Sequence, residues 1–171
     1  PFLDVTESDW FYDDVRFANQ NGLLNGVEKD LFAPEEPMTR GMLVTVLWRL
    51  DGETAPKTAT TFTDVDANAY YADAVAWAAE SGVVNGIGGN KFDPEGNVTR
   101  EQIAAILFRY AAFKGVDTAA RADLTAFPDA EKTSAYARDA LSWAVAAALV
   151  NGTKEGSTIY LDPQGSATRA Q

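Results

Sequence analysis

Three arginines stand in the same short motif, and their type and spacing suit them to binding a ligand. Each follows a threonine in the order Thr39-Arg40, Thr99-Arg100 and Thr168-Arg169. After the first motif, the apolar residues Leu43, Val46 and Leu47 recur three and four positions apart, which is typical of an amphipathic helix, and the second motif is followed by a similar run. We therefore predict that each threonine is a helix N-cap and each arginine the first helical residue.

A cation at the start of a helix is unusual, because the helix dipole already places about half a positive charge there. Three repetitions of this placement favour an anionic ligand nearby. The unpaired backbone N–H groups of a first helical turn, together with a guanidinium group, suit a carboxylate or a phosphate. The alternative is that each arginine pairs with surface acids, which are plentiful in a chain with a formal net charge of −11, and contributes little.

Composition excludes several other classes of function. The chain has no Cys and no His, so it lacks disulfides, thiolate metal sites and the commonest metal ligand and general base. No nucleophile motif or recurring pair of carboxylates is present, and we predict neither an enzyme nor a bound cofactor or metal. The net negative charge argues against nucleic acid and anionic membranes as partners. No apolar run is long enough for a transmembrane helix, so we predict no membrane insertion.

The sequence repeats itself three times. Residues 1–50 and 61–110 align without a gap at a constant offset of 60, and a third copy begins near Phe127 with insertions near 131–135 and 153–159. Self-similarity at a fixed period is the signature of a repeat architecture. We place the copies at residues 1–54, 61–113 and 126–171, the third without its second helix, with polar linkers at 51–61 and 114–126.

Each copy is expected to contain the same elements. We predict first helices at 11–21, 71–81 and 137–148 and second helices at 40–51 and 100–113. Gly22 and Gly82 are predicted left-handed helix ends, whereas Ala148 at this place predicts that the third helix runs on. The Asn-Gly pairs predict tight turns at Asn25-Gly26, Asn85-Gly86 and Asn151-Gly152. Thr99 and Gln102 have the spacing of a capping box, which Thr39 lacks.

Other recurring residues have structural interpretations. Asp4, Asp64 and Asp129 most simply cap loops or the first helix. Trp77 and Trp143 are predicted to pack in the core rather than to form sugar platforms. Asp64, Asp66 and Asn68 resemble the start of a calcium loop, but later positions of that motif are not satisfied and the other copies do not repeat it, so no calcium site is predicted.

The ordered motifs Phe-x-Asp-Val, Gly-x-x-Asn-Gly, aromatic-x-Pro and Thr-Arg resemble S-layer homology (SLH) domains in three tandem copies. The resemblance implies an all-α fold: three helix-loop-helix repeats in a pseudo-threefold arrangement with a central helical bundle and three lobes, together forming one anchoring unit. It also implies an extracellular location at the bacterial cell wall or S-layer. The implied partner is a secondary cell-wall polysaccharide, often pyruvylated, bound in grooves between copies, and the chain is expected to be part of a larger surface protein.

Carried over by position, the resemblance implicates the three arginines in ligand binding. The threonines beside them and the Asn-Gly pairs are expected to contact the same ligand. The expected ligand-binding residues are Arg40, Arg100, Arg169, Thr39, Thr99, Thr168, Asn25, Gly26, Asn85, Gly86, Asn151 and Gly152. The Ala-Glu that follows the arginine in the family reads Gly41-Met42, Glu101-Gln102 and Ala170-Gln171 here, so the glutamate is missing from all three copies. A protein–protein interaction module of the surface layer remains the alternative function.

Overall fold

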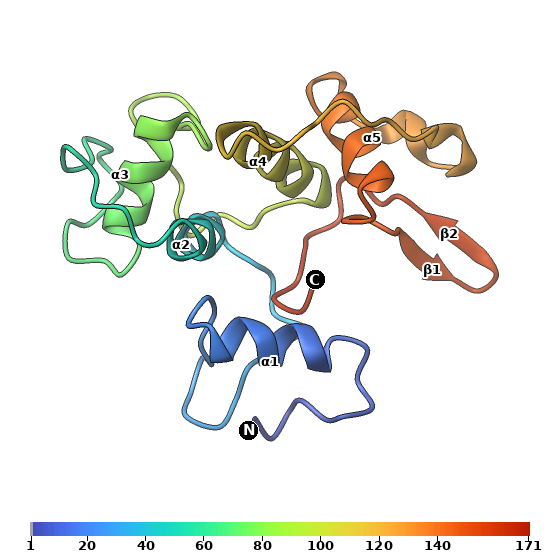
Figure 1. The fold of residues 1–171 in the computed structure, drawn as a ribbon, viewed down its shortest axis with the longest axis horizontal. Helices are drawn as coiled ribbons and strands as arrows, with labels where there is room; N and C mark the ends of the chain where they lie inside the picture. The colour runs from blue at the N-terminus through green and yellow to red at the C-terminus, as the bar shows by residue number, and fades with distance from the viewer. Residues whose placement is uncertain (1) are drawn as a thin grey trace. The chain divides into compact units, whose positions relative to one another are not determined.

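The computed structural model describes residues 2–171; Pro1, with which the first expected copy starts, lies outside the described residues. Over this range the regular structure consists of α-helices, short 3-10 helices and one small sheet (Figure 1). The α-helices are α1 (Tyr12–Gln20), α2 (Arg40–Leu50), α3 (Ala72–Ser81), α4 (Arg100–Phe113) and α5 (Arg138–Ala146). The other elements are η1 (Leu124–Ala126), η2 (Ala130–Lys132), η3 (Ala135–Ala137), β1 (Thr153–Glu155) and β2 (Thr158–Tyr160).

The expected fold class, an all-α chain around a central helical bundle, is wrong. Strands β1 and β2 form an antiparallel hairpin in which Thr153 pairs with Tyr160 and Glu155 with Thr158 (Figure 1). Gly156 begins the two-residue turn with a φ of +60°, as a tight hairpin connection requires. The insertion near 153–159 therefore folds as a sheet, because its β-branched and aromatic residues favour an extended chain on both sides of that glycine. The architecture is mixed.

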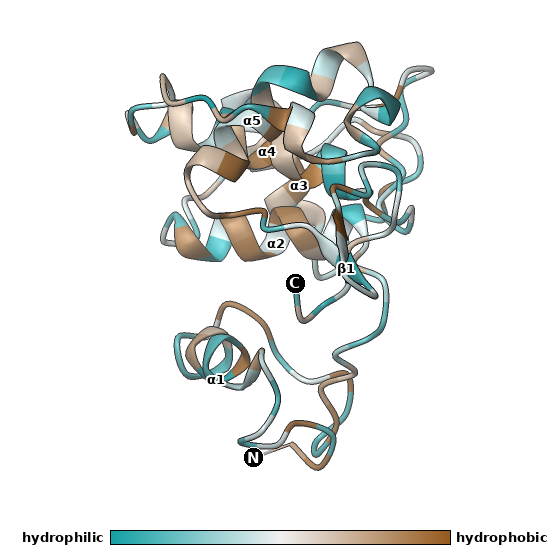
Figure 2. Ribbon diagram, turned by 90° about the vertical axis from the view of Figure 1, so that its right-hand side faces the viewer, coloured by the Kyte–Doolittle hydropathy of each residue, from teal (hydrophilic) through white to brown (hydrophobic). Residues whose placement is uncertain are grey.

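The α-helices begin and end within two residues of the predicted positions. The hydroxyl of Thr39 accepts the N–H of Met42 at 3.2 Å, and Thr99 and Gln102 form the reciprocal capping box. Figure 2 shows apolar residues along α2, of which Leu43 is among those buried. None of the helices within residues 2–171 combines the length and hydrophobicity that a membrane span needs.

The first helix of each copy is followed by a residue in the left-handed backbone conformation, and in the third copy this residue is not a glycine. Gly22 and Gly82 have φ angles of +68° and +73°, which confirms the predicted left-handed ends. The prediction that the third helix runs on is wrong, since α5 stops at Ala146 and Ala148 has a φ of +57°. A residue with a side chain pays roughly 1–2 kcal/mol for this conformation, and the need to turn the chain here outweighs that cost.

The described chain divides into two compact units. Unit 1 comprises residues 2–80, 85–97 and 167–171, and unit 2 comprises residues 81–84 and 98–166. One apolar cluster of unit 1 contains Phe11, Val15, Phe32 and Ala170, and a cluster of unit 2 joins residues of α4 and α5, such as Leu141, to the loop residue Leu161. The loops that carry the repeated motifs are thus anchored in a core.

The tryptophans of the later first helices pack as predicted. Trp77 is 4 % exposed, and its Nε1 donates to Oδ2 of Asp51 at 3.2 Å. Trp143 is equally buried and meets Phe108 of α4 edge to face, with ring centroids 5.5 Å apart. Phe17, at the same position of α1, is 60 % exposed, so the first copy leaves this face of its helix open.

Candidate functional site

Arg40, the first residue of α2, holds a loop of the second copy within unit 1. Its Nε donates to the carbonyl oxygen of Phe92 at 2.8 Å, and its Nη2 donates to that of Asn85 at 2.9 Å. The guanidinium carbon lies 4.8 Å from the ring centroid of Phe92, within cation–π range. One side chain therefore ties both ends of the loop at 85–92 together.

Arg169 repeats this arrangement on the first copy, also within unit 1. Its Nε donates to the carbonyl oxygen of Phe32 at 2.9 Å and its Nη2 to that of Asn25 at 2.7 Å. The guanidinium carbon lies 4.7 Å from the ring centroid of Phe32, and Nη1 faces the sulfur of Met42 at 3.8 Å. Because Arg169 is only 6 % exposed, its guanidinium is largely covered.

Arg100, in unit 2, departs from the pattern. Its Nε donates to the carbonyl oxygen of Leu161 at 3.1 Å, where the other two copies have a phenylalanine. Within residues 2–171, Nη1 and Nη2 of Arg100 have no hydrogen-bond partner, and the only fully buried side-chain polar atom lacking one is the hydroxyl of Thr133. The terminal nitrogens of Arg100 therefore reach solvent, at the end of a half-buried side chain.

The backbone N–H groups at the helix starts are not open, contrary to the sequence hypothesis. In each motif the first and second residues donate to two loop carbonyls at 2.8–3.0 Å: Arg40 and Gly41 to Gly96 and Pro94, Arg100 and Glu101 to Gly165 and Pro163, and Arg169 and Ala170 to Glu36 and Pro34. In α2 and α4 the third N–H is taken by the threonine cap. An anion at these sites must be bound by side chains.

The Asn-Gly pairs are not the tight turns that we predicted. The chain reverses further on, where Glu28 bridges to Leu31 and Gly88 to Lys91. Gly26 has no positive φ, but a Cβ there would lie 2.6 Å from two carbonyl oxygens, so close approach of the backbone requires the glycine. The asparagines act through their backbone: the carbonyl oxygen of Asn25 accepts a hydrogen bond from Arg169, and that of Asn85 accepts one from Arg40. The structure brings Asn25 to Arg169 and Asn85 to Arg40, whereas in the described part of the chain no hydrogen bond joins Asn151 to Arg100.

Each copy has an aspartate that is hydrogen-bonded to the same residue whose carbonyl oxygen accepts an arginine N–H. The carboxylate of Asp64 accepts the N–H groups of Phe92 and Asp93 at 2.9 and 2.8 Å. The same pairs recur for Asp4 with Phe32 and Ala33, and for Asp129 with Leu161 and Asp162, which confirms their capping role. One peptide residue is thus bonded through its N–H to an aspartate and through its C=O to an arginine. We call this arrangement the Asp–peptide–Arg clamp.

The charges of the clamp respond to burial and hydrogen bonding. Burial raises the pKa of Asp64, but the N–H groups of Phe92 and Asp93 lower it more, so the pKa lies below its ordinary value. Asp4 behaves in the same way. Burial lowers the pKa of Arg100 and Arg169 by disfavouring the charged form. An arginine remains a cation at neutral pH, so both side chains keep their positive charge despite this partial burial.

Sequence reasoning missed Glu101, which is 2 % exposed beside Arg100. Its carboxylate accepts the N–H and hydroxyl of Ser134 at 2.9 and 2.7 Å and the amide of Gln164 at 2.7 Å. These bonds occupy the acid that follows Arg100 in the chain. An acid in the first turn of a helix was the only available signal, and it did not reveal the long-range partners.

An exposed aromatic residue recurs at one position of each copy, seven residues before the position of Trp77. Nothing in the sequence assigned these residues a role. These residues are Trp10, Tyr70 and Tyr136, which are 69 %, 59 % and 58 % exposed. Tyr70 interacts electrostatically with Arg169, and the hydroxyl of Tyr136 donates to Glu101 at 3.5 Å. Their alignment was visible in the sequence, but their exposure was not.

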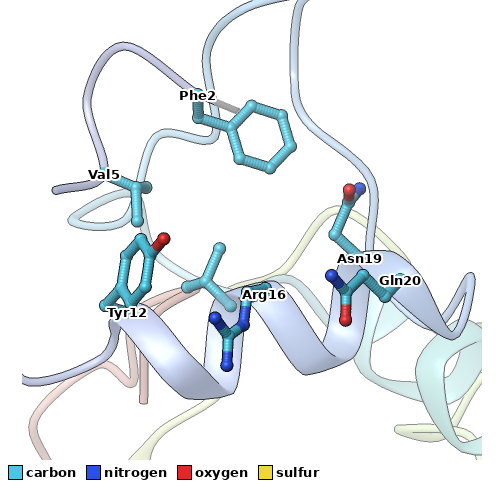
Figure 3. Close-up of a pocket in the computed structure, with 7 residues that line it drawn as sticks. Phe2, Val5, Tyr12, Arg16, Asn19 and Gln20 are labelled. Carbon is cyan, nitrogen blue, oxygen red and sulfur yellow. The ribbon is translucent and has the colours of Figure 1, made fainter. Parts of the chain in front are cut away.

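A pocket of about 240 Å³ lies away from the arginines, between α1 and the loop before it (Figure 3). Phe2 and Val5 line it from the loop, and Arg16, Asn19 and Gln20 line it from the helix. It contains none of the predicted ligand-binding residues.

Sequences similar to this chain occur within larger proteins of different kinds. The chain is 28 % identical over 171 residues to an endoglucanase from Bacillus sp. (strain KSM-635), covering 100 % of this chain and 18 % of that protein. It is 28 % identical over 148 residues to the surface-layer 125 kDa protein of Lysinibacillus sphaericus, covering 86 % and 12 %. A solved structure, the undecaheme cytochrome from the S-layer of Carboxydothermus ferrireducens, matches with a TM-score of 0.43 and 24 % identity over 90 % of this chain and 18 % of that one.

The chain spans less than a fifth of each of these proteins, so the activities in their names belong to them. The S-layer homology domain family itself matches residues 1–41, 61–104 and 126–171, and each of these segments contains one Thr-Arg motif. The resemblance seen in the sequence is thereby confirmed. Since three segments that make up most of its length match one family, this chain belongs to the S-layer homology domain family.

Proposed function

We propose that this chain is a non-covalent anchor that binds an anionic, pyruvylated secondary cell-wall polysaccharide and so retains a larger surface protein at the bacterial cell wall. S-layer homology domains are cell-surface anchoring modules of S-layer and cell-surface proteins, and this role is the starting point of the proposal. The finer part of the proposal, the chemistry of the ligand, depends on the arginine clefts.

The observation that carries the proposal is the state of Arg100. Two terminal nitrogens of one guanidinium face solvent without a partner in the described chain, and the neighbouring acid, Glu101, is bonded elsewhere. A guanidinium end with both nitrogens open matches the two oxygens of a carboxylate. A pyruvate ketal places one such carboxylate on an otherwise neutral sugar, and partial burial strengthens the interaction by limiting the screening by solvent.

Arg40 and Arg169 complete the proposed set with graded contributions. Both donate two N–H groups to loop carbonyls, so their first role is to shape the loop. We expect Arg169 to contribute least to affinity because its side chain is nearly covered. Threonine hydroxyls and asparagine amides remain in the proposed ligand set as donors to sugar hydroxyls: Thr39, Thr99, Thr168, Asn25, Asn85 and Asn151.

The exposed aromatic residues extend the proposed site. Tyr70 and Tyr136 present their rings at the surface of unit 1 and unit 2, respectively. An aromatic face can cover the apolar face of a sugar while the guanidinium takes its carboxylate. A ligand with both features would therefore gain from both contacts.

Co-sedimentation with purified cell walls tests the proposal. We expect the parent chain to be retained by walls that carry pyruvylated polysaccharide and lost from walls whose pyruvyl groups have been removed by mild acid. Arg100→Gln should reduce retention about tenfold or more, because a hydrogen-bonded charge pair is lost. Arg121→Gln, which removes an equal charge from an exposed loop of the same unit, is the control and should be retained like the parent. Retention that survives removal of both pyruvate and polysaccharide would instead indicate a protein partner.

A further inference from the structure

The three copies differ in the loop that lies against their arginine. This loop runs from the Asn-Gly pair to the peptide residue of the Asp–peptide–Arg clamp, and we call it the clamp loop. It has five residues in the first two copies, 27–31 and 87–91, and eight in the third, 153–160. The clamp loop and arginine of the third copy lie in unit 2 and those of the other copies in unit 1, so each pair is described within its own unit.

The base of the clamp loop is the same in all three copies. In the first and second copies, the first residue of the loop donates its N–H to the carbonyl oxygen of the last residue, at 2.9 and 2.8 Å. In the third copy the corresponding residues, Thr153 and Tyr160, pair at the open end of the β1–β2 hairpin (Figure 1). The additional residues therefore lengthen the loop at its tip and leave the pair that closes it unchanged.

One backbone angle beside the loop changes with the length of the loop. Gly152 has a φ of +84°, a conformation that glycine adopts at little cost, whereas Gly26 and Gly86 at the same position do not have a positive φ. Strand β1 begins directly after Gly152, so this glycine is where the chain turns into the hairpin. A change in the sign of φ turns the preceding peptide plane, and that plane carries the carbonyl oxygen of Asn151.

The open end of Arg100 coincides with this turned peptide. In the other two copies, the asparagine before the loop accepts a hydrogen bond from Nη2 of the arginine: Asn25 from Arg169 at 2.7 Å and Asn85 from Arg40 at 2.9 Å. Within residues 2–171 no such bond joins Asn151 to Arg100, although Nε of Arg100 keeps its bond to the clamp residue Leu161 at 3.1 Å. Arg100 is therefore placed like the other arginines and lacks only the partner that the asparagine supplies to them.

A second difference removes the aromatic ring that covers the guanidinium. In the first two copies the clamp residue is a phenylalanine, and the guanidinium carbon of the arginine lies 4.7 Å (Phe32) or 4.8 Å (Phe92) from its ring centroid. In the third copy the clamp residue is Leu161, whose side chain has no ring for a cation–π contact. The charge of Arg100 is therefore shared with fewer groups of the protein than the charges of the other two arginines.

We propose that the long clamp loop of the third copy, with Gly152 in the left-handed conformation, turns the carbonyl of Asn151 away from Arg100 and so makes this cleft the one that binds the carboxylate of the ligand most strongly. In the other two copies, the asparagine carbonyl competes with the ligand for the same end of the guanidinium. Gly152 acts on the ligand through Arg100 and is accordingly a positioning residue. The identity of the ligand rests on the proposed function, whereas the state of the guanidinium does not.

Nitrogen-15 NMR of the guanidinium groups in the full chain tests the inference without a ligand. A guanidinium held at both Nε and Nη2 gives separate Nη1 and Nη2 signals, whereas one held at Nε alone rotates about its Nε–Cζ bond and gives one averaged signal. We expect one averaged signal from Arg100 in the parent chain, assigned by its absence from Arg100→Gln. Replacing residues 153–160 with the five residues 87–91 of the second copy should split it into two. Arg169 should give two signals in both chains.

The affinity of the same samples for purified pyruvylated wall polysaccharide, measured by isothermal titration calorimetry, tests the consequence. The chain with the short loop should bind about tenfold more weakly, because a charge-assisted hydrogen bond to the ligand is exchanged for one to the protein. Charge does not explain such a loss, since Lys154 and Glu155 cancel in the natural loop whereas residues 87–91 contain only Lys91. Ser157→Asn is the matched control. It keeps eight residues and a sequence that suits the hairpin turn, and it should behave like the parent in both measurements.

Two separate signals from Arg100 in the parent chain would overturn the inference, and this result needs no variant. One averaged signal in a folded short-loop chain, or equal affinity of that chain and the parent for the polysaccharide, would also overturn it. If the polysaccharide binds neither chain, the proposed function is wrong, and the NMR signals still decide whether the loop opens Arg100. Deletion of residues 155–157, which also leaves five residues, replaces the exchanged loop if thermal unfolding shows that the first variant has lost the fold.

Discussion

Replacing Asp64 with asparagine should break a hydrogen bond of one Asp–peptide–Arg clamp without changing the shape of the side chain. The carboxylate accepts two N–H groups, and asparagine can accept only one while its amide faces the other N–H as a second donor. A hydrogen bond to a charged group contributes about 1.5–3 kcal/mol. We expect Asp64→Asn to lower the free energy of unfolding by about 2 kcal/mol and the melting temperature by roughly 4–8 °C.

The loss should depend on pH in a defined direction. The pKa of Asp64 in the folded chain lies below the ordinary aspartate value of 3.8, so its stabilisation is present above that value and is lost as the pH falls through the lower folded pKa. Urea unfolding followed by tryptophan fluorescence should show the full difference between parent and variant at pH 7 and a smaller one at pH 2.5.

Asp73→Asn is the control for this measurement. Asp73 is an exposed acid in the first turn of α3, and its loss should cost only about 0.3–1 kcal/mol. If Asp64→Asn costs no more than this control at pH 7, or if its cost is the same at pH 2.5, the carboxylate does not hold the loop as described.

Three further predictions concern packing and buried polar groups. Gly86→Ala should cost about 3 kcal/mol, because the new Cβ would lie 2.6 Å from a backbone oxygen, whereas Gly82→Ala meets only the positive φ and should cost about 1 kcal/mol, both by urea unfolding. Burial, with a hydrogen bond to Glu95, raises the pKa of Tyr71 to about 12. An absorbance titration should therefore show one tyrosine that ionises late and that is missing from Tyr71→Phe. The stability that the neutral phenol contributes should be lost as the pH rises from about 10 through 12. Glu101→Ala should lower the melting temperature by several degrees more than Glu101→Gln, which keeps an acceptor for Ser134.

The helices could be predicted from the sequence because their signals are local. Thr99 and Gln102 form a capping box within four residues, and the apolar spacing after Arg100 continues to the end of α4. The repeat itself revealed which residues are equivalent. Such signals depend only on residues close together in the chain, so they predict the helix whatever the rest of the fold is.

The partners of the arginines could not be predicted because they are distant in the chain. Arg40 bonds a carbonyl 52 residues away, Arg100 one 61 residues away and Arg169 one 137 residues away. A backbone carbonyl has no sequence signature, so the guanidinium could be assigned only to an anion or an acid. The helix-start amides were misjudged for the same reason, since loop carbonyls from other copies take them.

The remaining errors came from equating a residue type with one conformation. Gly26 is needed for close packing rather than for a turn, and Ala148 adopts the backbone angle that glycine has in the other copies. The hairpin arose from an insertion that alignment to the other copies could only mark as extra. Close approach of the backbone decides the case of Gly26, whereas the hairpin and the left-handed Ala148 follow from the local path of the chain.

The affinity of purified pyruvylated wall polysaccharide for the Arg40→Gln, Arg100→Gln double variant, measured by isothermal titration calorimetry beside the parent chain, tests the central claim most directly. Both chains should have the same circular dichroism spectrum, and the double variant should bind at least 30-fold more weakly, as expected for two lost contacts of about 1 kcal/mol each or more. Equal affinity in two equally folded chains would contradict the claim that these guanidinium groups hold the glycan.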